Sequence, residues 1–262
     1  MYLKFFSLIL FSPVFVFANG LAGSGSGWTP VISLFAGAGN IHAGSQSQTS
    51  TGDDNELFIY NSPSENKTVG LGGVFIGAQH DLSSQFFIET GLEYNYLSSM
   101  NITGSNTTGN DPESDPESAT AYSYQYKFQT QQLLAVAKLF TQINFLQTPH
   151  ELYPYVSLGL GAAFNTSHDF SSSTQESGSV NLTPGFDSHT DINFSYRLGL
   201  GLETNLSDNL RAGLGYEFID FGKSALGQGE VTMNNYSTPT NFNLAGPKTY
   251  ANELKAQVSY LF

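Results

Sequence analysis

The sequence has no cysteine, few charged residues and no long apolar run. Without cysteine, a disulfide scaffold and a cysteine-based zinc site are excluded. Asp, Glu, Lys and Arg make up 12% of the 262 residues, which is about half of their usual share in a soluble globular domain. Nine Lys and Arg stand against 22 Asp and Glu, with no basic cluster. This balance argues against a nucleic-acid partner, whose phosphates need clustered Lys and Arg.

Glycine and aromatic residues are abundant instead, with 27 Gly, 14 Tyr and 21 Phe. This composition, without a long apolar helix, is typical of β-rich proteins. Residues 1–18 carry an early positive charge at Lys4, a short interrupted apolar run and a small residue at Ala18. We interpret them as a signal peptide that is cleaved before Asn19, in preference to a buried N-terminal helix, because no helical stripe follows.

Alternating polarity predicts β-strands along the rest of the chain. The clearest segment, 190–205, has apolar residues at even positions from 192 to 202 and polar residues or glycine at the odd ones. Similar alternation, less clear in the first, second and seventh segments, predicts eight strands at 31–43, 68–80, 86–97, 121–140, 152–165, 190–206, 210–221 and 248–262.

Long and short connections follow one another between these strands. The segments 44–67, 98–120, 166–189 and 222–247 are long, and 81–85, 141–151 and 207–209 are short. This layout predicts an all-β fold: an eight-stranded antiparallel up-and-down transmembrane β-barrel with four long external loops and short periplasmic turns. We expect a signal peptide at 1–18, a short N-terminal periplasmic segment at 19–30 and the barrel at 31–262, with both termini periplasmic.

The two faces of the strands favour a membrane barrel over a soluble sandwich. One face carries Leu, Phe and Tyr, while the other carries Gly, Ser and Asn with isolated charges. Lipid-facing apolar residues around a small polar lumen produce this pattern. In the predicted strand 121–140, we place Tyr122, Tyr124, Tyr126 and Phe128 outward and Lys127 inward. Three charges, Lys138, Asp220 and Lys248, are predicted to point outward near strand ends.

The remaining strand charges predict an ionic network inside the lumen. If Leu206 lies opposite Leu210, Arg197 is diagonal to Glu217, and Glu203 is diagonal to Arg211. One interpretation is that these charges neutralise each other and fill a narrow lumen. The other is a gated solute or ion path lined by Arg197, Glu217, Glu253 and Lys255. The predicted network consists of Glu89, Glu93, Lys127, Arg197, Glu203, Arg211, Glu217, Glu253 and Lys255.

Other motifs give weaker predictions. The acidic segments 53–56 and 111–118 have oxygen ligands suited to Ca²⁺ but lack EF-hand spacing, so we interpret them as hydrated recognition loops. The histidines are scattered, and neighbouring residues such as Ser188 and His189 point to opposite faces of a strand. Paired glycines do not complete a phosphate-binding fingerprint and are interpreted as small inward residues that ease curvature: Gly37/Gly39, Gly159/Gly161, Gly199/Gly201 and Gly213/Gly215.

Together, the signal peptide, the eight alternating strands, the four long polar segments and the C-terminal strand ending in VSYLF resemble the opacity-type and OmpA-type families of eight-stranded outer-membrane β-barrels. The terminal Phe262, with Tyr260 two positions earlier, is similar to the signal that the barrel-assembly machinery reads in those families. The resemblance implies a monomer inserted in the outer membrane of a Gram-negative cell, in contact with its lipid and lipopolysaccharide. It is architectural and implies no specific activity.

We therefore expect a non-enzymatic outer-membrane barrel that acts in surface interaction or adhesion, or in envelope structure. Long loops on a rigid scaffold commonly carry recognition, so the expected partner is a host or extracellular ligand. Two other classes stay open: a narrow, porin-like channel for small solutes or ions, and a lipid-modifying outer-membrane enzyme. We expect no catalytic residue, cofactor or metal ligand.

Overall fold

The computed structural model describes residues 27–51, 57–109, 119–143, 151–176, 182–233 and 236–262. Within them the chain is almost entirely strand, and no described helix is long and apolar enough to cross a membrane. The strands are β1 (Trp28–Ala43), β2 (Gln46–Thr51), β3 (Leu57–Ser62), β4 (Glu65–Asp81), β5 (Phe86–Gly109), β6 (Thr120–Thr141), β7 (Leu152–Glu176), β8 (Leu182–Phe186), β9 (His189–Ser207), β10 (Leu210–Met233) and β11 (Tyr236–Leu261).

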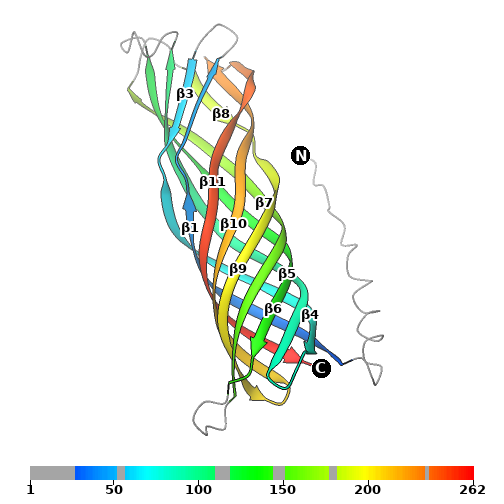
Figure 1. Cartoon of the computed structure of the whole chain (residues 1–262). Helices are drawn as coiled ribbons and strands as arrows, with labels where there is room; N and C mark the ends of the chain where they lie inside the picture. The colour runs from blue at the N-terminus through cyan, green and yellow to red at the C-terminus, as the bar shows by residue number, and fades with distance from the viewer. Residues whose placement is uncertain (1–26, 52–56, 110–118, 144–150, 177–181, 234–235) are drawn as a thin grey trace.

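Eight of these strands close into a ring in which every neighbouring pair is antiparallel, in the order β1, β4, β5, β6, β7, β9, β10, β11 and back to β1. This confirms the predicted eight-stranded barrel. Closure leaves no free edge in this ring, so backbone N–H and C=O groups pair with the neighbouring strand on both sides. The start of β1 and the C-terminus meet at one end, where the amide of Phe262 donates to the carbonyl of Pro30 at 3.1 Å (Figure 1).

The register fixes the tilt of the strands. Following hydrogen-bonded partners once around the ring from Val31 leads back to Ile41, ten residues further along β1. Such a stagger requires strands that are tilted against the barrel axis. Two residues at the same height along this axis on neighbouring strands are therefore not direct partners but lie a little more than one residue away from that register. The partners in this path are Val31, Gly77, Gly91, Val136, Gly159, Arg197, Ile219, Ala251 and Ile41.

The predicted loops are largely strand in the described residues. Strand β5 continues to Gly109, β7 continues to Glu176, and β10 and β11 stay paired as far as Met233 and Tyr236. The segments β2, β3 and β8 carry β1, β4 and β9 onward after short breaks. This part of the barrel, here called the extension, comprises β2, β3, β8 and residues 100–109, 120–128, 168–176, 221–233 and 236–248. The ten residues of β5 that belong to the extension span roughly 30 Å along the strand.

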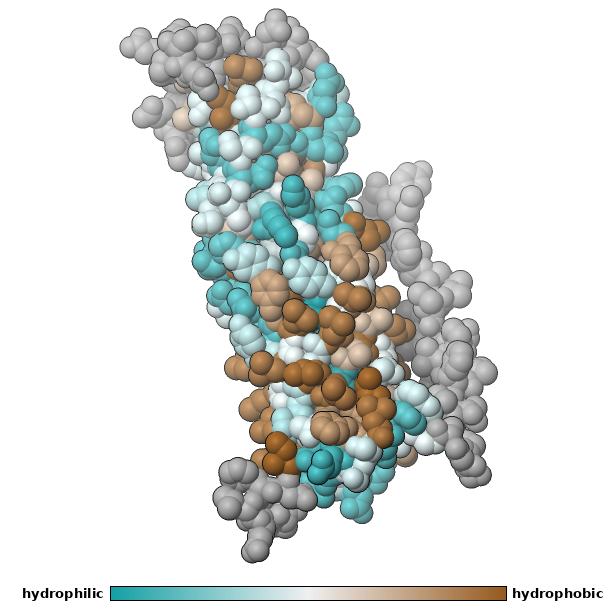
Figure 2. Space-filling model, viewed as in Figure 1, coloured by the Kyte–Doolittle hydropathy of each residue, from teal (hydrophilic) through white to brown (hydrophobic). Residues whose placement is uncertain are grey.

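The two parts of the barrel differ in which face carries the apolar side chains. Below the extension, large apolar residues are exposed on the outer surface; Phe194 is 70% exposed and Leu34 is 65% exposed. Figure 2 shows these residues gathered in the lower part of the molecule, with hydrophilic residues over the upper part. This apolar belt includes Leu34, Leu92, Leu133, Leu158, Leu160, Phe194, Leu198, Leu200, Leu214, Leu254 and Val258. Lipid surrounds such a belt in a transmembrane barrel.

Inside the extension, a buried core rich in aromatic side chains fills most of the lumen, with a few buried Ser, Thr and Asn side chains beside it. Tyr60 lies at its centre, with its ring centroid 5.9 Å from that of Tyr124, 5.5 Å from Phe186 and 6.2 Å from Phe242. Burial raises the pKa of the Tyr124 hydroxyl to about 12, so this phenol stays neutral. Water outside and apolar packing inside make the extension resemble a water-soluble barrel. The core also includes Phe58, Tyr126, Phe128 and Phe221, with Phe170 packed against it.

The orientation predicted for β6 is therefore wrong. Tyr122, Tyr124, Tyr126 and Phe128 point inward, and the Lys127 side chain is 49% exposed on the outer surface. Lys138, predicted to point outward, is buried in the lumen at 2% exposure. The prediction assumed that the tyrosines face lipid, but they lie above the apolar belt, where the outside is water.

Irregularities in three strands accompany the change of faces. In β5 the register shifts between Leu97 and Met100, so the inward positions change from odd to even. Asp169 in β7 and Gly222 in β10 both have positive φ, at 56° and 80°, where the register is also irregular. Bulges of this kind re-aim the following side chains and bend the strand.

A side chain closes the extension where strand pairing fails. Strand β2 has no backbone ladder with β11. Instead, the Gln48 amide donates to the carbonyl of Asn243 at 2.7 Å and accepts from the amide of Ala245 at 2.7 Å. Gln48 thus supplies one donor and one acceptor, the pair of groups that a neighbouring strand would offer.

The aromatic core predicts how the extension responds to substitution. We expect Tyr60→Ala to destabilise the extension by about 3 kcal/mol or more, because it removes a buried ring that joins β3 to β6, β8 and β11. Limited proteolysis of the reconstituted protein measures this directly. Asn61→Ala, which changes the next, exposed side chain, is the control. Equal protease resistance in both variants would show that the core does not hold the extension together.

Candidate functional site

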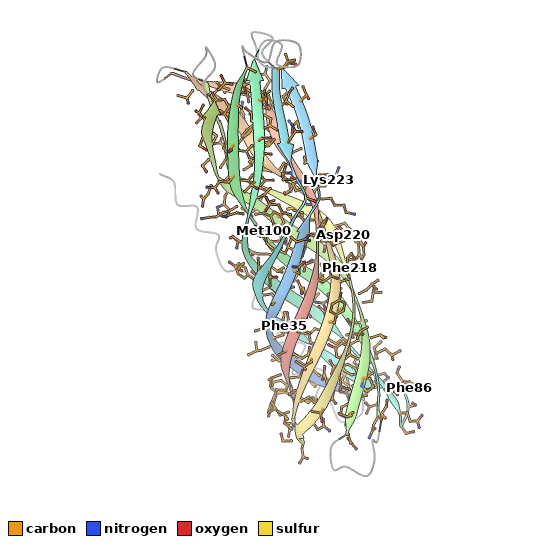
Figure 3. All side chains as sticks on the ribbon, turned by 90° about the vertical axis from the view of Figure 1, so that its left-hand side faces the viewer. Phe35, Phe86, Met100, Phe218, Asp220 and Lys223 are labelled. Atoms are coloured by element: carbon orange, nitrogen blue, oxygen red, sulfur yellow. The ribbon has the colours of Figure 1, made fainter. Side chains whose placement is uncertain are left out.

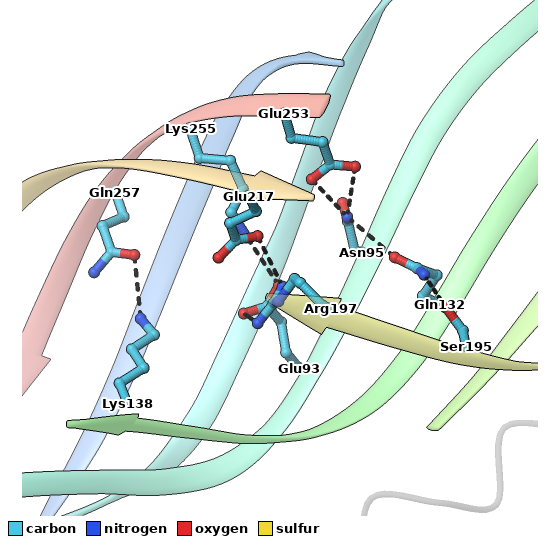
Figure 4. A network of polar contacts seen from close by, with 10 residues as sticks. All are labelled: Glu93, Asn95, Gln132, Lys138, Ser195, Arg197, Glu217, Glu253, Lys255 and Gln257. Atoms are coloured by element: carbon cyan, nitrogen blue, oxygen red, sulfur yellow. Dashed lines mark hydrogen bonds and ion pairs between the residues drawn. The ribbon is translucent and has the colours of Figure 1, made fainter. Parts of the chain in front are cut away.

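Four charged side chains meet at the centre of the lumen, on β5, β9, β10 and β11. Arg197 pairs with Glu93 through both of its terminal nitrogens, with Nη2 to Oε2 at 2.9 Å, and its Nη1 lies 3.2 Å from Glu217 Oε2. Lys255 Nζ completes the square, 3.1 Å from Glu93 Oε1 and 2.5 Å from Glu217 Oε2 (Figure 4). We call these four residues the ionic quartet. All four are at most 2% exposed.

The quartet forms because alternate residues of a strand face the same side. Glu93, Arg197, Glu217 and Lys255 each occupy the inward parity of a strand whose outward neighbours are apolar. The β9–β10 register places Gly199 opposite Glu217, so Arg197 reaches Glu217 diagonally. The same register places Gly213 opposite Glu203, which makes Arg211 the diagonal neighbour of Glu203.

A second group of charges lies nearer to the end with short turns. Arg211 Nη1 contacts Glu89 Oε1 at 3.2 Å, and its Nη2 donates to Gln79 Oε1 at 2.7 Å. The guanidinium also lies over two aromatic rings, 4.8 Å from the centroid of Phe87 and 5.1 Å from that of Tyr153. Arg211 is thus held by charge, hydrogen bonding and cation–π contacts together.

Lys138, Gln257 and Glu203 form a third set of contacts in the lumen. Lys138 Nζ donates to Gln257 Oε1 at 3.2 Å, and the Gln257 amide donates to Glu203. Lys138 also lies over the rings of Phe75 and Tyr155, at 5.1 and 5.4 Å. Glu203 therefore bonds to an amide, while its predicted partner Arg211 binds Glu89 instead.

Glu253 lies on the side of the quartet toward the extension. It belongs to a series of hydrogen-bonded side chains that includes no cation. The Asn95 amide donates to both Glu253 oxygens, at 3.4 and 3.3 Å, and to Gln132 at 3.5 Å. Gln132 donates to Ser195 at 2.6 Å (Figure 4). This series of hydrogen bonds ends at the carbonyl of Asp220, to which the Ser195 hydroxyl donates at 2.6 Å.

Eight of the nine residues predicted for the lumen lie there, and Lys127 is the exception. Lys127 instead pairs with Asp169 on the outer surface at 3.0 Å. The sequence analysis missed Lys138, although its strand carries a signal: Leu133 and Leu139 stand on the opposite parity and belong to the lipid-facing side. With Lys138 as the fourth cation, the cluster formed by these described residues contains five carboxylates and four cations.

Glycines make room for the large side chains around this cluster. A Cβ atom at Gly201 would lie 2.4 Å from the Tyr155 ring, and one at Gly215 would lie 2.5 Å from the Tyr155 hydroxyl. Both glycines face inward, as the sequence predicts for the pairs Gly199/Gly201 and Gly213/Gly215. The space they leave is occupied by an aromatic ring.

The remaining sequence motifs form no clear site. The acidic segments 53–56 and 111–118 lie outside the described residues. Elsewhere in the described chain, no group of three or more His, Asp or Glu side chains could hold a metal ion. Among the histidines, His189 pairs with Asp191 at 3.4 Å, and His168 pairs with Asp169 at 3.3 Å. Tyr260 and Phe262, the predicted assembly signal, are exposed, with ring centroids 4.9 Å apart.

Comparison with known proteins identifies the family. The family described as "outer membrane protein beta-barrel domain" matches residues 36–262, so the chain belongs to it. The protein is an outer-membrane β-barrel, which places it in the outer membrane of a Gram-negative cell. No curated protein sequence matches the chain.

Three solved structures of distantly similar proteins cover most of the chain. Neisserial surface protein A has 11% identity and a TM-score of 0.37, with 88% of this chain and 97% of that chain covered. Ail, the attachment invasion locus protein of Yersinia pestis, has 12% identity and a TM-score of 0.32, with 88% and 98% covered. OprG from Pseudomonas aeruginosa has 10% identity and a TM-score of 0.39, with 88% and 95% covered. Likenesses this distant say nothing about activity.

The ionic quartet makes a specific prediction about stability. We expect Arg197→Met alone to cost about 3–5 kcal/mol, because it leaves two buried carboxylates with one cation. Neutralising the whole quartet, with Glu93→Gln, Arg197→Met, Glu217→Gln and Lys255→Met, should restore most of the loss. Urea unfolding in lipid vesicles, followed by the change in gel mobility on boiling, measures both variants. If Arg197→Met alone is as stable as the wild type, the prediction is wrong.

Proposed function

We propose that this protein is a non-enzymatic, non-conducting barrel that presents a rigid surface outside the cell for interaction with a host or extracellular ligand. The observation that carries the proposal is the extension: a strand-built, aromatic-packed continuation of the barrel beyond the apolar belt. Recognition residues commonly lie on loops held by a rigid scaffold. A scaffold this long holds its connecting segments well away from the lipid surface.

The orientation follows from the same feature. We propose that the short-turn end, with the start of β1 and the C-terminus, faces the periplasm and that the extension faces outward. Long external segments and short periplasmic turns are usual for barrels of this class. In this orientation Tyr260 and Phe262 lie at the periplasmic end, where the barrel-assembly machinery would read them before insertion. The proposed barrel functions as a monomer, because its ring of strands is complete within one chain.

The state of the lumen supports a closed barrel over a channel. The ionic quartet fills the lumen at the level of the apolar belt, and the aromatic core fills it again within the extension. An eight-stranded barrel is just wide enough for such side chains. A solute path along Arg197, Glu217, Glu253 and Lys255 would have to open two unlike barriers, one held by charge and one by apolar packing.

Planar-bilayer recording tests the closed lumen. We expect the purified wild-type barrel to give no single-channel steps, and the neutralised quartet variant to stay equally silent, because the aromatic core still closes the extension. A water-filled porin recorded in the same membrane is the positive control. Discrete steps from the wild-type barrel would overturn the proposal and favour the channel.

Removal of the extension tests the surface role. A shortened barrel, in which each hairpin of the extension is replaced by a tight turn, should still insert, because it keeps the belt and the lumen cluster. We expect cells that display it to lose adhesion to host cells or matrix, compared with cells that display the full chain. Gel mobility before and after boiling controls for folding. Undiminished adhesion of the shortened barrel would contradict an interaction role for the extension.

A further inference from the structure

The cations of the lumen belong to three sets of contacts, and each set is neutral. The ionic quartet holds two carboxylates and two cations. Arg211 balances Glu89. Gln257 bridges Lys138 and Glu203, since its amide accepts from the amine and donates to the carboxylate. These sets use every described Lys and Arg of the lumen, so one carboxylate of the cluster has no cation to balance it.

Glu253 is that remaining carboxylate. It is fully buried on β11, and no described Lys or Arg lies within ion-pair distance of its side chain. Its register partner on β10 is Glu217, so the two carboxylates stand directly opposite each other on neighbouring strands. Glu217 already holds two cations, Arg197 at 3.2 Å and Lys255 at 2.5 Å. Like charges in directly opposite positions are destabilising.

Glu253 lies at the upper edge of the apolar belt, away from water. The outward residue beside it, Leu254, is 61% exposed in the belt. Figure 3 shows Phe218, from the same level of β10, between Phe35 below and Asp220 above. An ionised carboxylate without a cation is costly in such surroundings, and a buried carboxyl group commonly becomes neutral instead.

The other neighbours of Glu253 are uncharged. On β1 its register partner is Gly39, and on β5 the Asn95 amide donates to both of its oxygens, at 3.4 and 3.3 Å. The Asn95 nitrogen also lies 3.5 Å from Gln132 on β6. The charged groups that face Glu253 are the members of the ionic quartet, namely Glu217 on β10, Lys255 on β11, Arg197 on β9 and Glu93 on β5. A charged Glu253 would therefore compete with the two quartet carboxylates for the same two cations.

Asn95 supplies a second, independent observation. Its Oδ1 atom is buried and accepts no hydrogen bond from the described residues. Its Nδ2 atom lies beyond the usual hydrogen-bond length from all three of its acceptors. A carboxylate offers this amide only acceptors, whereas a carboxylic acid offers an acceptor and a donor. A proton on Glu253 thus supplies the kind of group that Asn95 Oδ1 needs.

We propose that Glu253 is a proton-binding site of the lumen: at neutral pH it is a carboxylic acid, and its proton is the fifth positive charge of the cluster. The acid and the Asn95 amide then form a pair in which each side chain donates and accepts. A metal ion fits less well, because hard cations take six or more oxygen ligands, and the side chains in contact with Glu253 are amides. The proposal concerns the inside of the barrel and does not depend on what the extension binds.

Infrared spectroscopy of the purified full chain tests the proposal, in a detergent without ester groups so that no lipid carbonyl overlaps. At neutral pH we expect the wild type to show the C=O stretch of a carboxylic acid, which shifts to lower frequency in D₂O. Glu253→Gln should remove the intensity of one acid from this band. Because glutamine copies the shape, donor and acceptor of the acid, the urea unfolding constant should change by less than about tenfold. The matched control is Glu230→Gln, at an exposed position of β10, which should leave the band unchanged.

Glu217→Gln separates the electrostatic cause from a structural one. With Glu217 neutral, Arg197 and Lys255 lack one carboxylate, so we expect Glu253 to ionise and the same acid intensity to disappear although Glu253 is intact. Unfolding in sodium chloride and in choline chloride should give equal midpoints, since a proton and not a metal ion balances the charge. Gel mobility on boiling shows whether each variant is folded.

Three outcomes overturn the proposal: no acid intensity that Glu253→Gln removes, acid intensity that persists in Glu217→Gln, or stability that depends on sodium. If Glu253→Gln does not fold, the wild-type band and its loss in Glu217→Gln decide the question.

Discussion

Closure of the antiparallel ladder is the constraint on which the whole molecule depends. In lipid, each backbone polar group must find a partner within the protein, and only a closed ring of strands provides this without helices. Here the same ring continues from lipid into water, from the apolar belt to the extension. The antiparallel hydrogen-bonding pattern of the backbone is nearly constant from the belt to the extension. The adaptation to lipid in one part and to water in the other therefore lies in the side chains.

The exchange of faces follows from that difference. At the belt, Leu and Phe face lipid, and the lumen receives charges and amides. In the extension, Ser, Thr and Asn face water, and Tyr and Phe fill the interior. The irregularities at Met100, Asp169 and Gly222 lie where one arrangement gives way to the other. In β6 the even positions face inward along the whole strand, so the odd-numbered Lys127 lies outside in the extension and the even-numbered Lys138 lies inside at the belt.

The lumen is closed by two unlike interactions, and each suits its surroundings. Buried charges in the ionic quartet depend on one another, since removal of a single member leaves an uncompensated charge. The aromatic core is held together by the packing of buried apolar surface instead, so no single substitution there leaves an unpaired charge. Together they fill the lumen at two levels of the barrel, one at the belt and one in the extension.

The sequence by itself determined the class of fold, the number of strands and most of the lumen cluster. Strict alternation in segments such as 190–205 reports which residues share a face, and the short turn at 207–209 fixes the register of Arg197 with Glu217. Periodicity cannot report which of the two faces points inward, and this caused the error at β6. Tyrosines alternating with Ser and Gln look the same whether lipid or water lies outside. Only the tertiary structure decides this, because the height of a residue along the barrel axis depends on the stagger accumulated around the ring.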